Sequence, residues 1–551
     1  MYIARASWPS ANGKVYQTIH LRESYRDGDH VRKREIANLT HCDPKEVAAI
    51  ELALQFKGDL SALGSLQDIQ LRQGLSVGAV WTVCQTARQL GIEAALGQDF
   101  AGQLALWQVL ARVLEQGSRL SAVRLAQVHA ACDVLGIRRG FDENDLYANL
   151  SWLSQHQPAI EKKLFATRHG QQSPQLFLYD VTSSYLEGEH NAYGAYGYNR
   201  DGKKGKQQIV IGLLCDEHGE PVSTEVFPGN TQDPKTFAAQ VSKASARFGC
   251  RQVTFVGDRG MIKSGQIAEL VEVGFHYITA ITKPQIDTLL AAGILQLELF
   301  AAEVCQVQQD GVRYVLRRNP LRAQQLAASR SAKQARIEQL CQGRNDYLLR
   351  HARAKVATAE KALRAKIQQL KIDAWLSVAS QGRALKLQVN PAALEEATRL
   401  DGCYVLKTDL AEAAASAQAV HDRYKDLAQV EQAFRTCKTT HLETRPIHVR
   451  TAEHTRGHVL VVMLAYLLRR ALSHAWNRLD VTVEEGLHQL QTLCAMELSV
   501  KGGGSCLRLP HPSAQAGALM QALNLRLPEA LPHKDVSVDT RKKLPERRKP
   551  R

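Results

Sequence analysis

Two short apolar segments of this sequence each run into an aspartate, and they constrain the fold more than any other feature. Leu176–Tyr179 is followed directly by Asp180, and Val253–Val256 reaches Asp258 after one glycine. Continuous apolar runs of this length are typical of strands buried on both faces of a sheet. A carboxylate at the end of such a strand is costly unless it meets a cation. We therefore expect two carboxylates at the rim of one sheet, although a single aspartate in such a place is more often the cap of a turn or helix.

The pattern around these two strands predicts a mixed α/β sheet. Three strands linked by hairpins come first, and helices and strands then alternate, which is the order of an α/β domain. The further elements expected are strands at 209–214 and 222–227, a helix at 234–248, a helix at 264–273, strands at 277–281 and 402–407, and helices at 411–438 and 456–477.

The composition changes along the chain and predicts six regions. Alternating polar and apolar residues around Asn12-Gly13 and Asp27-Gly28 indicate a small β-meander, and helical spacing follows from about Pro44 to Ala166. The expected regions are a β-rich N-terminal DNA-binding region (1–58), a helical domain (59–170), the first part of the sheet core (171–283), a basic helix-rich insertion (284–402), the second part of the core (403–480) and a C-terminal region with a basic tail (481–551).

The charge of the chain points to a polyanionic partner. The formal net charge is +15, and neutralising phosphates with cations releases counterions, so nucleic acid is favoured over an anionic membrane surface. The longest apolar run near the end, Val459–Leu468, is shorter than the roughly 20 residues that cross a bilayer, and no signal-peptide pattern follows Met1. We expect a cytoplasmic protein. The 11 cysteines include no close Cys-x-x-Cys pair, so we interpret them as small buried apolar side chains.

Three basic segments are candidates for contact with DNA. The third strand of the meander carries His30, Arg32, Lys33 and Arg34, which fit either a phosphate backbone or a solvated edge that prevents aggregation. The helical segment 317–371 is dense in cations with few acids, and this one-sided charge favours DNA contact over a merely solvated helix. The tail from Thr540 to Arg551 has the composition of a disordered basic arm.

A third candidate carboxylate lies in the predicted helix that ends near residue 438. Tyr424, Glu431 and Lys438 are seven residues apart, so they line up along one stripe, and Arg435 lies one turn beyond Glu431. This stripe runs beside an apolar one, so we expect Glu431 to border the core rather than open water. Periodicity alone leaves open whether Glu431 belongs to a functional site or to a structural salt-bridge network. The apolar stripe is formed by Leu427, Val430, Phe434 and Cys437.

Four blocks in this order resemble the DDE transposases of bacterial insertion sequences. The closest group carries a Tyr-Arg-Glu-Lys signature around its final glutamate, and the resemblance runs from about residue 176 to 472. The blocks are Tyr179–Gly188, Pro228–Thr231, Gly257–Met261, and Tyr424–Lys438 followed by Arg445-Pro446-Ile447. The resemblance implies a ribonuclease-H-like α/β core with a large helix-rich insertion, preceded by the meander and the helical domain.

The resemblance also implies a mechanism. Its catalytic and metal-binding triad maps onto Asp180, Asp258 and Glu431, with Mg²⁺ as the cofactor and Mn²⁺ as a substitute. Carboxylates that converge on one point suit two hard cations, which stabilise the attacking and leaving oxygens of a phosphodiester. Hydrolysis of one strand would free a 3′ hydroxyl for transesterification, and no organic cofactor is needed.

The implied partners are double-stranded DNA at the terminal inverted repeats, target DNA, and a second copy of the chain in a synaptic homodimer. Tyr424 and Lys438 match signature positions that approach DNA phosphates. The signature arginine would fall at Leu427, which departs from the family pattern, and Arg435 is a candidate substitute. Two alternatives stay open: a metal-dependent DNA nuclease without strand transfer, and a non-catalytic DNA-binding protein.

Overall fold

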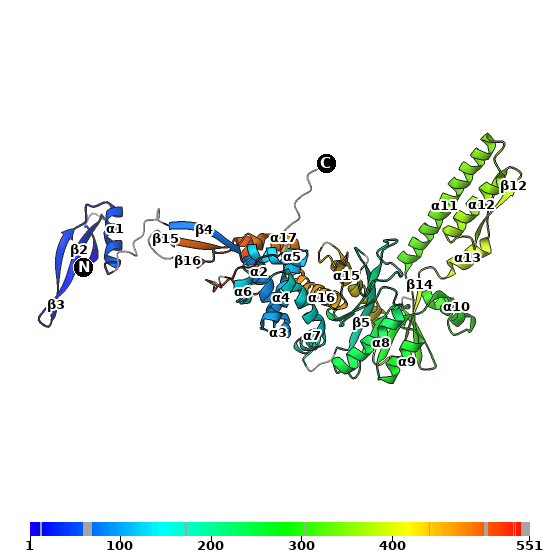
Figure 1. Ribbon diagram of the computed structural model, residues 1–551, viewed down its shortest axis with the longest axis horizontal. Helices are drawn as coiled ribbons and strands as arrows, with labels where there is room; N and C mark the ends of the chain where they lie inside the picture. The colour runs from blue at the N-terminus through cyan, green and yellow to red at the C-terminus, as the bar shows by residue number, and fades with distance from the viewer. Residues whose placement is uncertain are drawn as a thin grey trace. The chain divides into compact units, whose positions relative to one another are not determined.

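The computed structural model describes most of the chain and divides it into two compact units (Figure 1). One unit comprises Met1–Ser76, Leu493–Pro512 and Leu527–His533, and the other comprises Val77–Thr492, Ser513–Arg526 and Lys534–Arg551. The expected turn at Asn12-Gly13 and the basic tail beyond Arg541 lie outside the described residues. These are 1–10, 14–58, 69–170, 174–188, 190–301, 304–439, 441–500, 505–532, 534 and 536–541.

The first unit contains two small antiparallel sheets. The predicted meander is formed by β1 (Tyr2–Pro9), β2 (Val15–Asp27) and β3 (His30–Asn38), and α1 (Pro44–Gln55) follows it. The second sheet has the order β16-β15-β4, with β4 at Ile69–Ser76, β15 at Cys494–Val500 and β16 at Ser505–Arg508.

The strand β4 corrects the expectation of helical structure from residue 44 to 166. Its partner β15 lies far along the chain, and the side chains of Gln73 and Cys494, 421 positions apart, are 3.2 Å from each other. Helical or strand spacing is a local signal, and it cannot report a pairing that distant residues create.

The second unit begins with a layer of helices around one long buried helix, α16 (Ala452–Trp476). α16 packs against α4 (Phe100–Leu114), α7 (Glu143–His169) and the edge strand β7 (Pro221–Pro228) of the main sheet. At its crossing with α7, a Cβ on Gly457 would overlap the backbone oxygen of Leu150, so glycine is what allows this close approach. The other helices of this layer are α2 (Gly78–Gln89), α3 (Ile92–Leu96), α5 (Arg119–Val128), α6 (Ala131–Leu135), α17 (Val483–Gln491) and α18 (Ala514–Ala522).

Among the described residues, one helix is long and apolar enough to cross a membrane, at Ala452–Leu479. The run Val459–Leu468, which by itself is too short to cross a bilayer, is only part of this helix. Within its most apolar window, 72% is buried inside the protein. Packing against α4, α7 and β7 accounts for its apolar sequence.

The main sheet has eight strands in the order β10-β11-β14-β9-β8-β5-β6-β7. β5, β8 and β9 run parallel, and β6 and β7 continue antiparallel from β5, which confirms the mixed ribonuclease-H-like core. Phe177, Tyr179, Phe237 and Phe255 form part of its core under helix α8. The elements in chain order are β5 (Leu176–Tyr185), β6 (Gln208–Cys215), β7 (Pro221–Pro228), α8 (Asp233–Ser242), β8 (Thr254–Gly257), α9 (Ser264–Glu272) and β9 (His276–Ala280).

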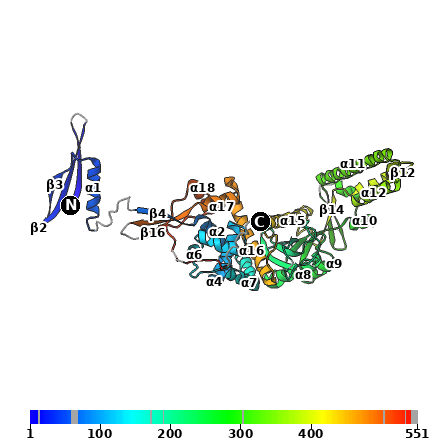
Figure 2. The ribbon, with the colours of Figure 1, turned by 45° about the horizontal axis from the view of Figure 1, so that its top comes forward.

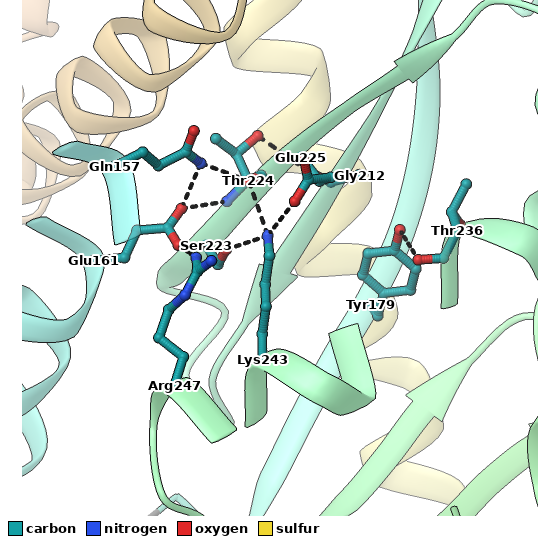
Figure 3. A network of polar contacts seen from close by, with 10 residues as sticks. All are labelled: Gln157, Glu161, Tyr179, Gly212, Ser223, Thr224, Glu225, Thr236, Lys243 and Arg247. Atoms are coloured by element: carbon teal, nitrogen blue, oxygen red, sulfur yellow. Dashed lines mark hydrogen bonds and ion pairs between the residues drawn. The ribbon is translucent and has the colours of Figure 1, made fainter. Parts of the chain in front are cut away.

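A buried polar network fastens α7 to the edge of this sheet (Figure 3). Glu161 of α7 is fully buried and accepts hydrogen bonds from the Ser223 hydroxyl (2.8 Å) and the Thr224 backbone N–H (3.2 Å). Arg247, in the π-helical turn Lys243–Arg247 that follows α8, pairs with the same carboxylate. Because its charge is matched and its oxygens are hydrogen-bonded, this buried carboxylate can join the helical layer to β7.

The first part of the insertion adds strands to the main sheet, and the rest forms a separate body. After α10 (Lys283–Ala291), strands β10 (Cys305–Gln309) and β11 (Val312–Arg318) join the sheet through β14 (Cys403–Thr408), which pairs with β9. Between β11 and β14 the chain forms a smaller body with its own core, in which α11 and α12 lie side by side (Figure 2). Its elements are α11 (Pro320–Arg350), α12 (Val356–Gln369), β12 (Leu376–Gln381), β13 (Ala384–Val389) and α13 (Pro391–Arg399).

Candidate active site

The two predicted aspartates lie beyond the carboxyl end of the parallel strand pair β5 and β8. The pairing of these strands reaches Leu178 opposite Val256, and Asp258 follows β8 directly. Asp180 is not at the end of its strand, as the sequence indicated, but inside β5, where it pairs with Leu213. The strand continues because β6 still supplies an antiparallel partner after β8 has ended.

The environment of Asp180 disfavours the ionised form of its carboxyl group. Its Oδ1 accepts a hydrogen bond of 2.8 Å from the backbone N–H of Val181. Burial nevertheless raises the pKa of the Asp180 carboxyl to about 7, and the negative charges of Asp258 and Glu431 act in the same direction, against the attraction of Arg200. A cation bound at this point would favour the ionised form.

Glu431 reaches the same place from a helix. The helix predicted for residues 411–438 is divided in two at Asp426, into α14 (Ala417–Lys425) and α15 (Leu427–Lys438). α15 packs on β5 with its buried face, which includes Val430 and Phe434. Glu431 itself is exposed, which corrects the expectation that it borders the core.

One pocket of about 350 Å³ brings the three carboxylates together. Asp180, Asp258 and Glu431 all line it, although they come from β5, from the turn after β8 and from α15. Three separate elements therefore contribute a carboxylate to the lining of this pocket, which we call its acidic wall. The remaining lining residues are Val181, Thr182, Arg200, Asp233, Met261, Phe434, Arg435 and Lys438.

Two aspartates that were not predicted from the sequence pair with two of the three cations that line this pocket, Arg200 and Lys438. The side chain of Asp201 is 1% exposed, and its Oδ1 accepts hydrogen bonds from Lys438 Nζ (2.9 Å) and Arg445 Nη1 (2.6 Å). Arg200 donates from Nη2 to both oxygens of Asp233, at 2.6 and 2.8 Å. No local pattern marks Asp201 or Asp233, because their partners come from distant segments.

The predicted DNA-contacting residues occupy different positions around the pocket. Lys438 and Arg435 line it, and burial lowers the pKa of Lys438 against the opposing effect of Asp201. The Tyr424 hydroxyl lies 3.5 Å from Asp258 Oδ1, a long hydrogen bond, and burial raises its pKa. Leu427 is the half-buried first residue of α15.

The donor set of the pocket fits a hard divalent cation. Carboxylate oxygens are the ligands that Mg²⁺ and Mn²⁺ prefer. In the described parts of the chain, no three His, Cys, Asp or Glu side chains are drawn together as closely as the ligands of a bound metal. To hold a cation, the three carboxylates would have to move closer together within the pocket. A bound cation would also favour the ionised form of Asp180 and so offset the raised pKa of its carboxyl.

A larger cavity of about 560 Å³ lies against other side chains of α15, among them Gln432 and Thr436, and contains none of the three carboxylates. Two arginines at its wall already have partners. Arg469 donates to Glu484 at 2.6 Å, and Arg470 donates to the Gly219 carbonyl at 3.2 Å. The smaller acidic pocket is therefore the candidate active site.

Comparisons with known proteins identify the family of the chain. A family model described as the transposase DDE domain matches residues 171–468, which is more than half of the chain and includes all three carboxylates. The N-terminal domain of IS1634 family transposases matches residues 9–62. A cryo-EM structure of the piggyBac transposase synaptic complex with hairpin DNA matches at 10% identity over 75% of each chain, but its TM-score of 0.34 is too low to support an argument. No curated protein matches the chain.

Proposed function

Because the chain belongs to the DDE transposases of insertion sequences, we propose that it cuts and rejoins DNA at the ends of its element, with Asp180, Asp258 and Glu431 as the metal-binding triad. The observation that carries the proposal is that these three side chains line one pocket beyond the parallel strands. The family implies a divalent metal, and the all-oxygen donor set favours Mg²⁺, with Mn²⁺ as a substitute.

Both the carboxylates and the cationic side chains of the pocket have a role in this proposal. Asp180 and Asp258 would bind the cation between them, and Glu431 would complete a second site from α15. When bound, the two cations would stabilise the attacking and leaving oxygens of the phosphodiester. Lys438 and Arg435 line the same pocket, so a phosphate there would lie between cationic side chains and the acidic wall.

The proposed partners are duplex DNA at the terminal inverted repeats, target DNA and a second copy of the chain that bridges two ends. The net charge of +15 and the match of residues 9–62 to a transposase N-terminal domain support DNA binding, and residues 1–58 are the proposed end-binding region. On β3, Arg32 and Arg34 pair with Asp27 and Glu23, so in this region Lys33 is the more available cation.

The test uses the full-length protein and a duplex that carries the terminal repeats of the element. We expect the parent to nick and join this DNA in Mg²⁺ and to lose both activities in EDTA. Asp258→Asn should still bind the duplex in a gel-shift assay but cut it at least about 1,000-fold more slowly. Asp373→Asn, which changes an exposed aspartate outside the pocket, is the matched control.

The products separate the alternatives. Cleavage without joining would identify a nuclease, and binding without cleavage would identify a non-catalytic DNA-binding protein. If Asp258→Asn cut DNA as fast as the parent, the triad assignment would be wrong.

A further inference from the structure

The outer face of helix α11 concentrates positive charge on one side. Its 31 residues include Arg322, Lys333, Arg336 and Arg344, at successive separations of 11, 3 and 8 residues. At about 3.6 residues per turn, these separations are close to three, one and two turns, so the four cations lie in one sector of the helix. The buried residues Ile337, Cys341 and Leu348 face the small core of the insertion and lie beside this sector, about 75° from its centre. The cation sector, called the outer face below, therefore flanks the buried side of the helix.

The acids of α11 lie on another side. Glu338 is two residues after Arg336, and Asp346 is two residues after Arg344. Two residues correspond to about 200° around a helix, so each acid points nearly opposite to the neighbouring cation. The helix therefore separates its charges instead of interleaving them.

The cations of this face are not neutralised within the described chain. Among the described residues, Lys333, Arg336 and Arg344 form no ion pair with a carboxylate. Within the part of the chain that the structure describes, the Arg322 side chain donates only to Gln325, at 3.2 Å. By contrast, Arg330 turns towards the core of the unit and pairs with Asp401. Uncompensated cations therefore gather on the outer face.

Two exposed apolar side chains share this face. Leu340 lies four residues from both Arg336 and Arg344, and Tyr347 lies three residues after Arg344. Their exposed fractions are 40% and 50%. The Tyr347 ring contacts that of His351, with ring centroids 4.3 Å apart. Cations clustered on one face are typical of surfaces that bind duplex DNA, and a tyrosine hydroxyl among them can hydrogen-bond a phosphate oxygen.

We propose that this outer face of α11 binds the phosphate backbone of duplex DNA, away from the acidic pocket. From Arg322 to Arg344 it spans 22 residues, or about 33 Å along the helix axis. One turn of duplex is about 34 Å, so the face is long enough to contact phosphates on both sides of a groove. The inference rests on the proposed function for the identity of the polyanion, but it concerns binding and not cleavage.

The test compares two double variants of the full-length protein, each of which removes two exposed cations. Arg336→Gln with Arg344→Gln changes the proposed face, and Lys162→Gln with Lys163→Gln changes α7 by the same net charge. Fluorescence anisotropy measures the Kd for terminal-repeat and unrelated duplexes over a range of salt. We expect the α11 variant to raise Kd about tenfold or more for both duplexes, and to reduce the salt slope by about 2. The α7 variant should change neither by more than about twofold.

Tyr347→Ala, with all cations retained, should weaken binding at an unchanged salt slope. The α11 variant should lose affinity for DNA, whereas Asp258→Asn should bind normally without cutting, so the two proposals fail separately. Parent-like Kd and slope in the α11 variant would overturn the inference. So would equal losses in both double variants, or a loss of self-association in sedimentation with DNA binding intact.

Discussion

The surroundings of the Asp180 carboxyl group make it harder to ionise than a carboxyl group in water. It lies inside a strand, next to two other carboxylates, and burial raises its pKa to about 7. In an unfolded chain the same group would ionise near pH 4. Between these two pKa values the folded state holds a proton that the unfolded state has released, so stability without metal should fall as pH rises from about 4 to about 7 and stay low above it.

Asp180→Asn should therefore stabilise the metal-free protein at pH 8, by about 1 to 3 kcal/mol, because asparagine cannot ionise. The gain should shrink towards pH 5, where the parent carboxyl is protonated. Chemical unfolding in EDTA at the two pH values measures it. In saturating Mg²⁺ the order should reverse, since only the parent keeps the full donor set. An equal difference at both pH values would show that ionisation of Asp180 is not the cause.

At the scale of elements, α15 is held to the sheet at its C-terminal end by a charge contact. Lys438, the last residue of α15, and Arg445 both donate to Asp201, which lies in the segment between β5 and β6. The other oxygen of Asp201 accepts a hydrogen bond from the backbone N–H of Tyr185, at 3.2 Å. Asp201 thus connects the strand that carries Asp180 with the helix that carries Glu431, as a positioning residue.

Asp201→Asn should lower kcat/KM for DNA cleavage about tenfold or more, mainly by raising KM. The reason is that Lys438 and Arg445 lose the carboxylate charge that positions them. Burial lowers the pKa of Lys438 and Asp201 opposes this, so the variant should lower that pKa further. Because Lys438 loses its positive charge as pH rises through its pKa, the alkaline limb of the pH profile of cleavage should move to lower pH.

A double-mutant cycle distinguishes positioning from general stability. In a Lys438→Met background, Asp201→Asn should slow cleavage less than it does in the parent, because only the contact with Arg445 remains to be lost. An unchanged alkaline limb, or fully additive losses, would show that Asp201 does not act through Lys438.

Strands and helices with local signals could be predicted from the sequence, and those made by distant partners could not. The runs at Leu176–Tyr179 and Val253–Val256 predicted β5 and β8, because burial on both faces leaves an apolar signature. β4 was missed because β15 creates it from the other end of the chain. The acidic residues of the candidate site could be predicted from the apolar runs and the motifs, although Asp180 lies inside its strand and not at the end. Asp201 could not be predicted, because it gains its role only when the segments that carry Lys438 and Arg445 come together.

At the scale of the whole molecule, the end of the chain is part of the second unit. The Lys534 N–H donates to Asp133 (2.7 Å), Gln127 donates to the Val538 carbonyl (3.0 Å), and the Val538 side chain is buried. Arg541, the last residue of this C-terminal strap (residues 534 and 536–541), donates its N–H to Glu143 at the start of α7 (3.1 Å).

Two truncations should separate the strap from the predicted basic tail. A chain ending at Arg541 should unfold like the parent but bind unrelated duplex DNA more weakly, with a smaller salt slope, because six cations are removed. A chain ending at His533 should in addition lose about 1 to 3 kcal/mol of stability, since it also loses the burial of Val538 and the strap hydrogen bonds. Equal unfolding midpoints for the two truncations would show that the strap adds nothing to stability.

The insertion leaves the sheet and returns to it at one point. Arg318 of β11 pairs with Cys403 of β14, and the Asn319 N–H donates to the Gly402 carbonyl at 2.8 Å. A Cβ on Gly402 would overlap the Asn319 oxygen, so this junction is tightly closed. Because the two ends already meet, what lies between them can grow, shrink or be exchanged with little strain on the acidic pocket. The body between β11 and β14 could therefore be replaced during evolution without a change in the acidic pocket. In such a lineage the proposed DNA-binding surface would change while the catalytic residues stayed the same.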